Sequence, residues 1–557
     1  MSSPRAAGAD VRTVEFADLP TADEHAAVPV RHPVVIVGAG PVGLTLAIDL
    51  AQRGLPVVLL DEDHRLSTGS RAICFAKRTL EIFDRLGCGQ RMVDKGVAWK
   101  LGRVFFKDAP LYSFDLLPEP GHARPAFINL PQYQCEAFLV DRARELPLLS
   151  LRWDHRVVGV QADAAGVLLE IQTPRGRHRL VADHLVACDG SRSTVRGLLG
   201  LESQGRVFHD RFLIADIRTT AELLPGGATE RWFWFDPPFH PGQSVLLHRQ
   251  PDDVWRVDFQ LGWQADPAEE KKPERIVPRV RALLAASLAR DVEFTLEWAS
   301  VYTFACMRMA HFRHGRVLFA GDAAHGVSPF GARGANSGVQ DADNLAWKLA
   351  RVVRGQATEV LLDSYAEERE VAADENIRCS TRSTDFITPK TEISRLFRDA
   401  VLGLAKDHAF ARGLVNSGRL SVPATLRTSP LNTPDEEAFD GAMQPGAVAA
   451  DAPLARDGRR AWLLQALDAD FTLLVFGPAP GWAAALPLQC LCLGAPGWFD
   501  EEGLASLRYD ARPGTAYLIR PDQHVCARWR APTEAGVRAA LARASAGVDA
   551  IKGSAEC

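Results

Sequence analysis

Residues 33–61 read PVVIVGAGPVGLTLAIDLAQRGLPVVLLD, and this stretch decides the fold. It begins with a short β-branched run that ends in glycines, which is typical of a buried parallel strand. Residues 44–54 repeat apolar side chains at helical spacing and end on a glycine, the usual residue after a helix. Residues 56–60 form a second apolar run. Strand, helix and strand within about thirty residues predict a βαβ unit.

The turn of this unit carries the pattern Gly38-Ala-Gly40-Pro41-Val-Gly43. In such a turn the first glycine makes the bend, the second admits a pyrophosphate, and the third lets helix and strand pack closely. The helix N-terminus adds free N–H groups and the positive end of a dipole. Asp61 closes the second strand, where an acid binds a ribose hydroxyl. The pattern predicts a dinucleotide site, and a glycine-rich turn that binds nothing is the alternative.

Two later segments fit the same bipartite site. Residues 188–196, CDGSRSTVR, contain Asp189 and Gly190 and are open to two interpretations, a binding motif or a turn before a capped helix. Residues 321–338, GDAAHGVSPFGARGANSG, follow the strand-like run RVLFA. Their Asp322 can accept a ribitol hydroxyl. The glycine-dense loop precedes a helix expected at 338–353 and presents N–H groups where a flavin ring gains negative charge on reduction.

The bulk composition narrows the class of protein. The chain has 557 residues, of which 47% are apolar and 24% charged, with a formal net charge of −5. That length predicts two or three domains. No basic block indicates nucleic acid, no apolar run of about 18 residues indicates a membrane span, and the N-terminus lacks the features of a secretory signal. We expect a cytoplasmic protein with a small-molecule partner and neither nucleic-acid nor membrane contact.

The cysteines follow no redox or metal-binding pattern. Ten are scattered along the chain without a CxxC pair. Buried free thiols in a reduced compartment are the expected state, in preference to a disulfide, and no metal site is expected. Cys490 and Cys492 stand two apart, and alternation along a strand would put both on one face.

The remaining chain divides by its pattern. Residues 204–308 are rich in Trp, Phe and Arg at alternating spacing, which predicts a second, largely antiparallel sheet. The Pro-, Ser- and Thr-rich stretch 418–440 is typical of a linker, and a compact α/β module follows it. We predict a flexible extension at 1–32, a discontinuous flavin-binding domain at 33–101, 130–203 and 309–417, a substrate-binding domain at 102–129 and 204–308, a linker at 418–440 and a C-terminal domain at 441–557.

The three motifs together resemble the GxGxxG, DG and GD signatures of the single-component (class A) flavoprotein monooxygenases that hydroxylate aromatic rings, such as phenol hydroxylase and 3-(3-hydroxyphenyl)propionate hydroxylase. The resemblance covers roughly residues 33–400. It implies an α/β fold in which a Rossmann-type, GR2-like FAD-binding domain is interleaved with a mainly antiparallel β-sheet substrate domain. It also implies a thioredoxin-like C-terminal α/β domain. Because that domain has no CxxC, we expect it to pack or to form a homodimer contact rather than to exchange thiols.

The resemblance assigns cofactor-binding roles position by position. Arg71 matches the family's arginine that meets the FAD pyrophosphate. Gln132 matches a glutamine that touches FAD, and Asp322 matches the aspartate that binds the ribityl chain. The DG pair serves both FAD and the passing NAD(P)H. The full set of matching positions is Gly38, Gly40, Pro41, Gly43, Asp61, Arg71, Gln132, Asp189, Gly190, Gly321, Asp322, Pro329, Gly331, Arg333, Gly334 and Asn336.

Two departures from the family pattern stand out. The loop along the isoalloxazine reads Gly331-Ala-Arg-Gly-Ala-Asn336, where most relatives have GGQGMN and 4-hydroxybenzoate hydroxylase has GAKGLN. Arg333 therefore predicts a fixed cation near the flavin. Phenol hydroxylase carries an Asp before its RTLE helix, whereas Ile73 occupies the matching stretch here, so that candidate base is absent.

For activity, the resemblance implies that NAD(P)H reduces FAD and that O₂ forms a flavin C4a-hydroperoxide, which hydroxylates a phenolic ring ortho to an existing hydroxyl. A general base should lie within reach of that hydroxyl. His248, Asp258 and Tyr302 on the second sheet are candidates, and each also fits a structural role on a sheet face. His325, beside Asp322, is interpreted as a packing histidine.

Two alternatives remain open. One is a tailoring hydroxylase of a polycyclic, polyketide-type aromatic metabolite. The other is a flavin-bound protein that acts in binding or assembly through its C-terminal domain. A retained DG motif disfavours the second, because it has little use without a nicotinamide partner.

Overall fold

A mainly parallel sheet forms the centre of the first domain. The computed structural model describes residues 14–67, 72–224, 229–288, 292–415, 420–494 and 497–546. β1 pairs in parallel with both β11 and β2, and the outer strands β20 and β8 extend the parallel part. The strand order is β19 (Arg313–His314), β20 (Val317–Phe319), β11 (Gly176–Ala187), β1 (Val30–Val37), β2 (Val57–Leu60), β8 (Leu149–Arg152), with β9 (Arg156–Ala162) and β10 (Val167–Thr173) extending from β11.

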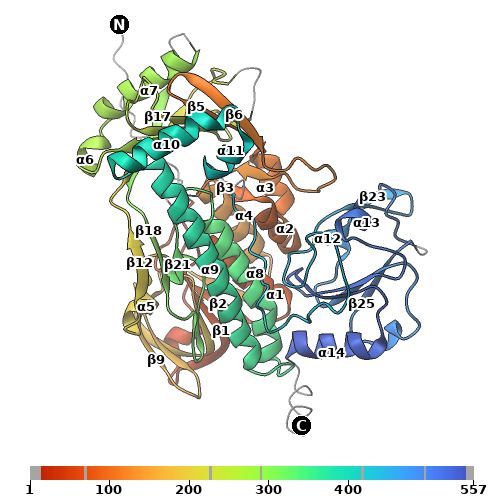
Figure 1. Ribbon diagram of the computed structural model, residues 1–557. Coiled ribbons are helices and arrows are strands. Elements are labelled where there is room, and N and C mark those ends of the chain that lie inside the picture. The colour runs from red at the N-terminus through yellow and green to blue at the C-terminus, as the bar shows by residue number, and fades with distance from the viewer. Residues whose placement is uncertain are drawn as a thin grey trace.

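Helices cover this sheet and close its core. Residues 34–37 and 57–60 are buried, as expected for strands covered on both faces. Two long helices, α8 and α9, run side by side through the middle of the molecule, and α1 packs against α8 (Figure 1). The helices of this domain are α1 (Pro41–Gln52), α2 (Lys77–Leu86), α3 (Gly89–Lys95), α4 (Gln132–Arg144), α5 (Thr194–Leu198), α8 (Gly334–Val353) and α9 (Val360–Ile387).

A seven-stranded sheet makes the second domain. It is antiparallel except where β14 and β5 run parallel. One face is apolar and is covered by α7 (Pro273–Leu288), which follows the short α6 (Pro267–Glu270). The strand order is β17 (Thr295–Tyr302), β13 (Arg211–Arg218), β16 (Val254–Leu261), β15 (Ser244–Arg249), β14 (Arg231–Phe235), β5 (Leu101–Phe106), β6 (Ala109–Asp115).

Two three-stranded sheets lie between these domains. All of their short strands precede the predicted flavin loop in sequence, and β21 leads directly toward it. One sheet contains β3 (Cys74–Ala76), β7 (Phe127–Asn129) and β4 (Val97–Trp99), and the other contains β12 (Ser203–Val207), β18 (Ala305–Met309) and β21 (His325–Gly326).

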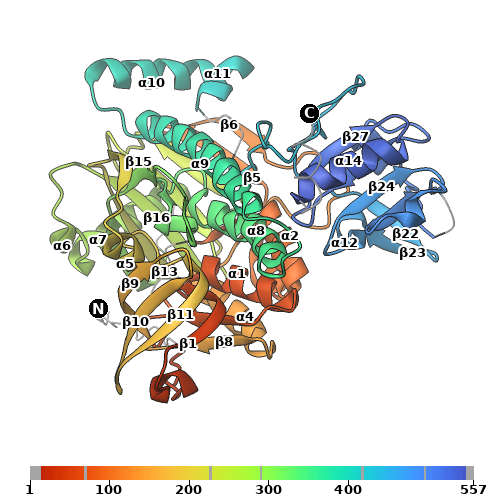
Figure 2. The same cartoon turned by 90° about the horizontal axis from the view of Figure 1, so that it is seen from below.

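The C-terminal part is a separate α/β module beside α1, α2 and α8, while α10 (Glu392–Ala405) and α11 (Ala409–Val415) lie across the outside of the substrate domain (Figure 2). The module has a four-stranded mixed sheet in the order β25-β24-β26-β27. Its elements are β22 (Pro453–Arg456), β23 (Arg459–Trp462), α12 (Leu463–Ala466), β24 (Thr472–Phe476), β25 (Gln489–Leu493), α13 (Leu504–Arg508), β26 (Ala516–Ile519), β27 (Val525–Trp529) and α14 (Glu534–Ser545).

Two secondary-structure expectations were wrong. The helix expected at 338–353 begins four residues earlier, at Gly334, so the glycine-rich segment enters the first helical turn. The interpretation of 204–308 as all sheet missed α7, whose apolar residues follow helical spacing and cover the sheet. A proline inside that helix, Pro278, made a helix look unfavourable in the sequence.

The two predictions about the cysteines agree with the described residues. All nine cysteines in those ranges are free thiols, and Cys490 and Cys492 share a face of β25 with their sulfurs 3.6 Å apart. None of the helices in those ranges combines the length and the apolar composition needed to cross a membrane. The same ranges contain no cluster of His, Cys, Asp and Glu suited to a metal ion.

Candidate active site

The glycine turn after β1 shows why each glycine is required. Gly38 has a φ of +103°, and a Cβ there would lie 2.5 Å from the carbonyl oxygen of Cys188. A Cβ on Gly43 would lie 1.9 Å from the carbonyl oxygen of Gly38. Gly40 differs, because its φ is an ordinary −73° and a Cβ would meet nothing within 4 Å. The first and third glycines are therefore fixed by the protein's own packing, whereas the second faces open space at the N-terminus of α1.

Asp61 lies where the acidic ribose ligand was predicted. It follows β2 directly, and its carboxylate accepts hydrogen bonds from the N–H groups of Ala39, at 2.5 Å, and Asp63, at 2.9 Å. The first bond ties the carboxylate to the glycine turn. Burial raises the pKa of Asp61 to about 6. The turn and the acid are thus joined at the carboxyl edge of the sheet.

The Asp189–Gly190 motif packs directly against this turn. One carboxylate oxygen of Asp189 accepts from the N–H of Val195 at 3.0 Å, and the other is buried without a partner among the described residues. Burial raises the pKa of Asp189. Gly190 has a φ of +78° and faces open space. Ser193 caps the following helix, so the capped turn expected from sequence is present together with an unsatisfied carboxylate that a ligand can use.

The third motif brings α8 onto α1. A Cβ on Gly338 would lie 2.6 Å from Val42, and one on Gly321 would lie 2.9 Å from it. His325 is an anchor, as predicted, because its Nε2 lies 2.7 Å from Asp341, which also accepts the N–H of Gly321. This network fixes the backbone beside Asp322, whose side chain is exposed.

The predicted flavin loop is shaped by Arg333. Gly331 has a φ of +100°, and a Cβ there would lie 1.8 Å from the guanidinium of Arg333, which is itself only 4% exposed. The arginine therefore folds back over Gly331 and puts a buried cation inside the loop, next to the N-terminus of α8. Both features favour an electron-rich group.

Asn336 acts as a brace between α8 and β3. Its amide nitrogen donates to the carbonyl oxygens of Cys74 and Ala332, at 2.8 and 2.6 Å. Its amide oxygen accepts from the N–H of Ala76 and the hydroxyl of Thr79, at 2.8 and 2.6 Å. This side chain is fully occupied by protein groups. A direct contact of Asn336 to FAD stays a prediction.

Gln132 and Glu136 bind the residues that flank 68–71; Arg71, predicted to meet the FAD pyrophosphate, lies outside the described residues. The Gln132 amide oxygen accepts from the N–H of Ala72 at 3.2 Å, and its nitrogen donates to Glu136 at 2.8 Å. Glu136 accepts from the N–H of Ser67 at 2.9 Å. The pair therefore fixes the backbone of Ser67 and Ala72.

The flavin loop meets the substrate sheet through aromatic contacts. Phe330, in the loop, packs edge-on against Phe212 of β13 and against Phe304, with ring centroids 4.9 and 5.5 Å apart. Tyr302 pairs with Phe212 across β13 and β17 and belongs to the same apolar cluster. Tyr302, one of the three predicted candidates for the general base, thus lies at the aromatic end of the sheet face that contacts the flavin loop.

The other two base candidates lie together. His248 of β15 and Asp258 of β16 are 3.2 Å apart. Arg256 is the cross-strand partner of His248, whereas Leu246 and Ile214 are those of Asp258. Burial, followed by the charge of Arg231, lowers the pKa of His248 to about 4, so its ring is neutral at pH 7. Burial would raise the pKa of Asp258, but His248 and the nearby arginines lower it overall. A carboxylate beside a neutral imidazole can accept a hydrogen bond from a hydroxyl group.

Sequence reasoning missed three further polar side chains on this face, Arg231, Gln250 and Arg256. Arg256 forms a two-pronged ion pair with Asp216, at 2.8 and 2.9 Å. Gln250 donates to the same carboxylate at 3.0 Å. The sequence signal that could have identified them is their alternation, at a period of two, with buried apolar residues along β14, β16 and the end of β15.

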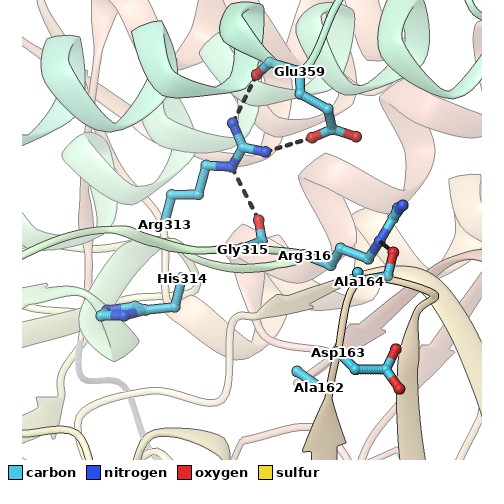
Figure 3. A pocket seen from close by; sticks show the side chains of 8 residues that line it. All are labelled: Ala162, Asp163, Ala164, Arg313, His314, Gly315, Arg316 and Glu359. Carbon is cyan, nitrogen blue, oxygen red and sulfur yellow. Dashed lines mark hydrogen bonds and ion pairs between the residues drawn. The ribbon is translucent and has the colours of Figure 1, made fainter.

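A surface pocket of about 370 Å³ lies elsewhere, between the start of β20, the β9–β10 turn and the start of α9 (Figure 3). Arg313 reaches across it to Glu359 and Gly315, and Arg316 reaches Ala164. Because Arg316 precedes β20 whereas the glycine motifs follow their strands, this pocket opens at the opposite edge of the sheet. The charge of Arg313 is already neutralised there by Glu359 and Asp363.

The three motifs fit FAD. The open space beside Gly40, the unsatisfied oxygen of Asp189 and the carboxylate of Asp61 all lie at the carboxyl edge of the sheet. The third motif packs on α1 there through Gly321 and Gly338, and Arg333 caps the N-terminus of α8. A parallel-sheet domain with this site, facing a second sheet, defines a flavin-dependent oxidoreductase.

Comparison with known proteins gives the family. A model described as FAD binding domain matches residues 31–380. A 12-dehydrotetracycline 5-monooxygenase/anhydrotetracycline 6-monooxygenase of Streptomyces rimosus is 31% identical over 91% of this chain and 96% of its own. A 3-(3-hydroxy-phenyl)propionate/3-hydroxycinnamic acid hydroxylase of Mycolicibacterium smegmatis is 30% identical over 66% of this chain and 64% of its own. The chain belongs to this family of FAD-dependent aromatic monooxygenases and is an enzyme.

A solved structure confirms the fold. The flavin-dependent monooxygenase PieE, in complex with FAD and substrate, superposes with a TM-score of 0.77 at 24% identity, covering 93% of this chain and all of its own. The predicted α/β fold is thus confirmed, and the family model confirms FAD as the cofactor. The thioredoxin-like nature of the C-terminal module stays a prediction.

The pKa of Asp61 predicts how FAD binding depends on pH. Ribose hydroxyls donate to the charged carboxylate, so bound FAD favours the deprotonated form. Affinity should be full above about pH 6 and should fall as the pH drops through that value. Flavin fluorescence titrations of the apoprotein between pH 5 and 8 measure this. Asp61→Asn should bind FAD more weakly at pH 7.5 and lose most of the pH dependence; an unchanged slope in that variant would assign it to another group.

Proposed function

We propose that this enzyme uses NAD(P)H and O₂ to add a hydroxyl group to a phenolic aromatic substrate, ortho to an existing hydroxyl. One oxygen atom enters the ring and the other leaves as water, while NAD(P)H supplies two electrons. The observation that carries the proposal is the contact between the flavin loop and the substrate sheet. Phe330 joins the two, and the His248–Asp258 pair lies on the sheet face that the loop meets.

The protein's own residues have three tasks in this reaction. Bound FAD supplies electron transfer from the nicotinamide and activation of oxygen. Arg333 and the N-terminus of α8 stabilise negative charge at the loop. The cluster of Phe212, Phe304 and Phe330 excludes water. Asp258, held by His248, accepts a hydrogen bond from the substrate hydroxyl and makes the ring more electron-rich.

A second candidate is hydroxylation of a polycyclic aromatic metabolite. It is supported by the relative named for action on anhydrotetracycline, which matches 91% of this chain. The relative named for hydroxyphenylpropionate supports the smaller substrate but matches only 66% of it. The two candidates share the same site and chemistry and differ in the size of the ring system.

A substrate panel tests both candidates. NAD(P)H oxidation by the purified holoenzyme would be followed with simple phenols, phenolic acids, naphthols and hydroxyanthraquinones, and products identified by mass spectrometry. At least one phenolic compound should accelerate NAD(P)H oxidation about tenfold or more and gain one oxygen. Stimulation by multi-ring compounds alone would select the second candidate. Flavin-bound protein with no stimulation and no product from any compound would favour a role in binding or assembly.

A further inference from the structure

The polar face of the substrate sheet contains four buried side-chain atoms that lack a protein partner among the described residues. They are the Nε of Arg231, the Nδ1 of His248, the Oε1 of Gln250 and the Oδ1 of Asp258. Arg231, His248 and Asp258 belong to the adjacent strands β14, β15 and β16, and Gln250 directly follows β15. Buried polar atoms are normally hydrogen-bonded, so a concentration of unsatisfied ones on one face indicates a ligand.

Strand pairing puts these residues next to one another. Trp232 pairs with Leu247 in antiparallel register, so Arg231 and His248 follow as neighbours on the opposite face. His248 in turn pairs with Arg256, and Asp258 lies one step along the same strand face. Neighbouring side chains on paired strands have Cβ atoms about 5 Å apart. The donor on Arg231 and the acceptors on His248 and Asp258 therefore lie within the width of an aromatic ring system.

Arg231 is the least satisfied of the four. Its side chain stacks on the rings of Trp99 and Phe233, 5.7 and 4.8 Å from their centroids, and is 5% exposed. Its polar contact is the thiol of Cys74, at 3.9 Å. Burial lowers the pKa of Arg231, and the charges of Cys74 and Asp258 offset only part of that decrease. A buried guanidinium without a carboxylate is costly, and such groups persist where something else supplies the acceptor.

Arg256 provides the internal contrast. It lies on the same face at similar burial, 2% exposed, but Asp216 neutralises it through two hydrogen bonds. The fold thus gives one buried arginine its carboxylate and leaves the neighbouring one with a thiol and two aromatic rings. Arg231 is also linked to the flavin loop through Cys74. Arg231 contacts the thiol of Cys74, and the carbonyl oxygen of Cys74 accepts a hydrogen bond from the amide of Asn336.

We propose that Arg231 binds an acceptor oxygen of the substrate, carbonyl or carboxylate, while Asp258 and His248 accept a hydrogen bond from an adjacent phenolic hydroxyl. The substrate class is then an aromatic hydroxy-ketone or hydroxy-acid with both oxygens on one edge of the ring system. This rests on the proposed function for the identity of the site and adds to it the functional groups that are recognised.

Binding to the oxidised holoenzyme, without NAD(P)H, tests this independently of turnover. The probes are 1-naphthol, 1-hydroxy-2-acetonaphthone and 1-methoxy-2-acetonaphthone, titrated against the flavin absorbance spectrum. 1-Naphthol lacks the carbonyl group of 1-hydroxy-2-acetonaphthone, and 1-methoxy-2-acetonaphthone has its hydroxyl group blocked by a methyl group. The hydroxy-ketone should bind about tenfold or more tightly than either of the other two, as a charged or buried hydrogen bond implies.

Two variants assign the preference to residues. Arg231→Met should bring the hydroxy-ketone to within about threefold of 1-naphthol and leave 1-naphthol itself unchanged. Asp258→Asn should remove the preference for hydroxyl over methoxy. Arg103→Met, on the neighbouring strand, is the matched control, because Arg103 is exposed and paired with Glu230. It should behave as the wild type.

Stability separates a binding role from a structural one. Removing an unpaired buried charge should leave the melting temperature of ligand-free Arg231→Met the same or higher. A lower melting temperature with the ketone preference retained would overturn the proposal, as would a wild type that binds the three probes equally. If the preference is found but no hydroxylated product forms, the proposed function fails while this binding site stands.

Discussion

Replacing Gly43 with alanine is expected to yield protein that retains no FAD and melts at a lower temperature. The new Cβ would lie 1.9 Å from the carbonyl oxygen of Gly38, a backbone atom that cannot move without displacing the end of β1. Relieving such an overlap costs about 3 kcal/mol or more and opens the turn that the pyrophosphate needs. The ratio of flavin to protein absorbance after gel filtration, together with thermal melts, measures both effects.

Gly40→Ala is the matched control in the same turn. Its backbone is ordinary for any residue, and its Cβ would meet no protein atom within 4 Å. The apoprotein should therefore melt as the wild type does, while FAD affinity falls because the methyl group occupies the approach of the phosphates. A Gly43→Ala protein with normal flavin content, or a Gly40→Ala protein with unchanged FAD affinity, would contradict the assignment of this turn.

Replacing Arg520 with methionine is expected to destabilise the enzyme by about 3–5 kcal/mol, the usual result of removing one partner from a buried ion cluster. Arg520 lies between β26 and β27 of the C-terminal module and binds Glu368 of α9 and Asp522. Lys348 of α8 lies 2.7 Å from the same glutamate. These four side chains are fully buried, so the variant leaves two carboxylates facing one lysine.

The electrostatics of this cluster show how strongly it depends on Arg520. Burial alone would raise the pKa of Glu368, yet the charges of Arg520 and Lys348 hold it well below its usual range. Burial lowers the pKa of Lys348 to about 8 despite the glutamate. Because α8 carries the flavin loop at its other end, the variant should also release FAD more readily.

Denaturant unfolding followed by flavin and tryptophan fluorescence measures the loss. Arg460→Met is the control, since its ion pair with Glu502 is about half exposed and surface pairs contribute little. Equal stability of the two variants would mean that the C-terminal module is not held by this cluster. A shift of the module's transition alone, with normal FAD retention, would mean that the module and the flavin loop are uncoupled.

The backbone of the flavin site could be predicted from the sequence because its motifs are local. Gly38 to Gly43 and Asp61 belong to one βαβ unit. Gly38 and Gly43 are explained by contacts inside that unit or with the adjoining Cys188, whereas Gly40 meets no protein atom. The Gly331–Arg333 pair was only half predicted. The cation was expected, but its packing over Gly331 depends on a loop conformation that spacing does not encode.

The substrate face could be predicted only in part, because it depends on strand register. His248 and Asp258 were named separately, and their contact follows from the pairing of β15 with β16. Arg231 was not named, since an arginine before aromatic residues looks like any solvated strand end. The Arg520 cluster joins residues about 150 positions apart, and no local pattern marks it.

The central claim is that this enzyme transfers an oxygen atom from O₂ to an aromatic ring at the face between Arg333 and the His248–Asp258 pair. The most direct test is turnover of an active phenolic compound under ¹⁸O₂, with mass spectrometry of the product. The account predicts one ¹⁸O atom in the new hydroxyl group, formed with oxidation of NAD(P)H. Product whose new oxygen carries no label, and so comes from water, would contradict it.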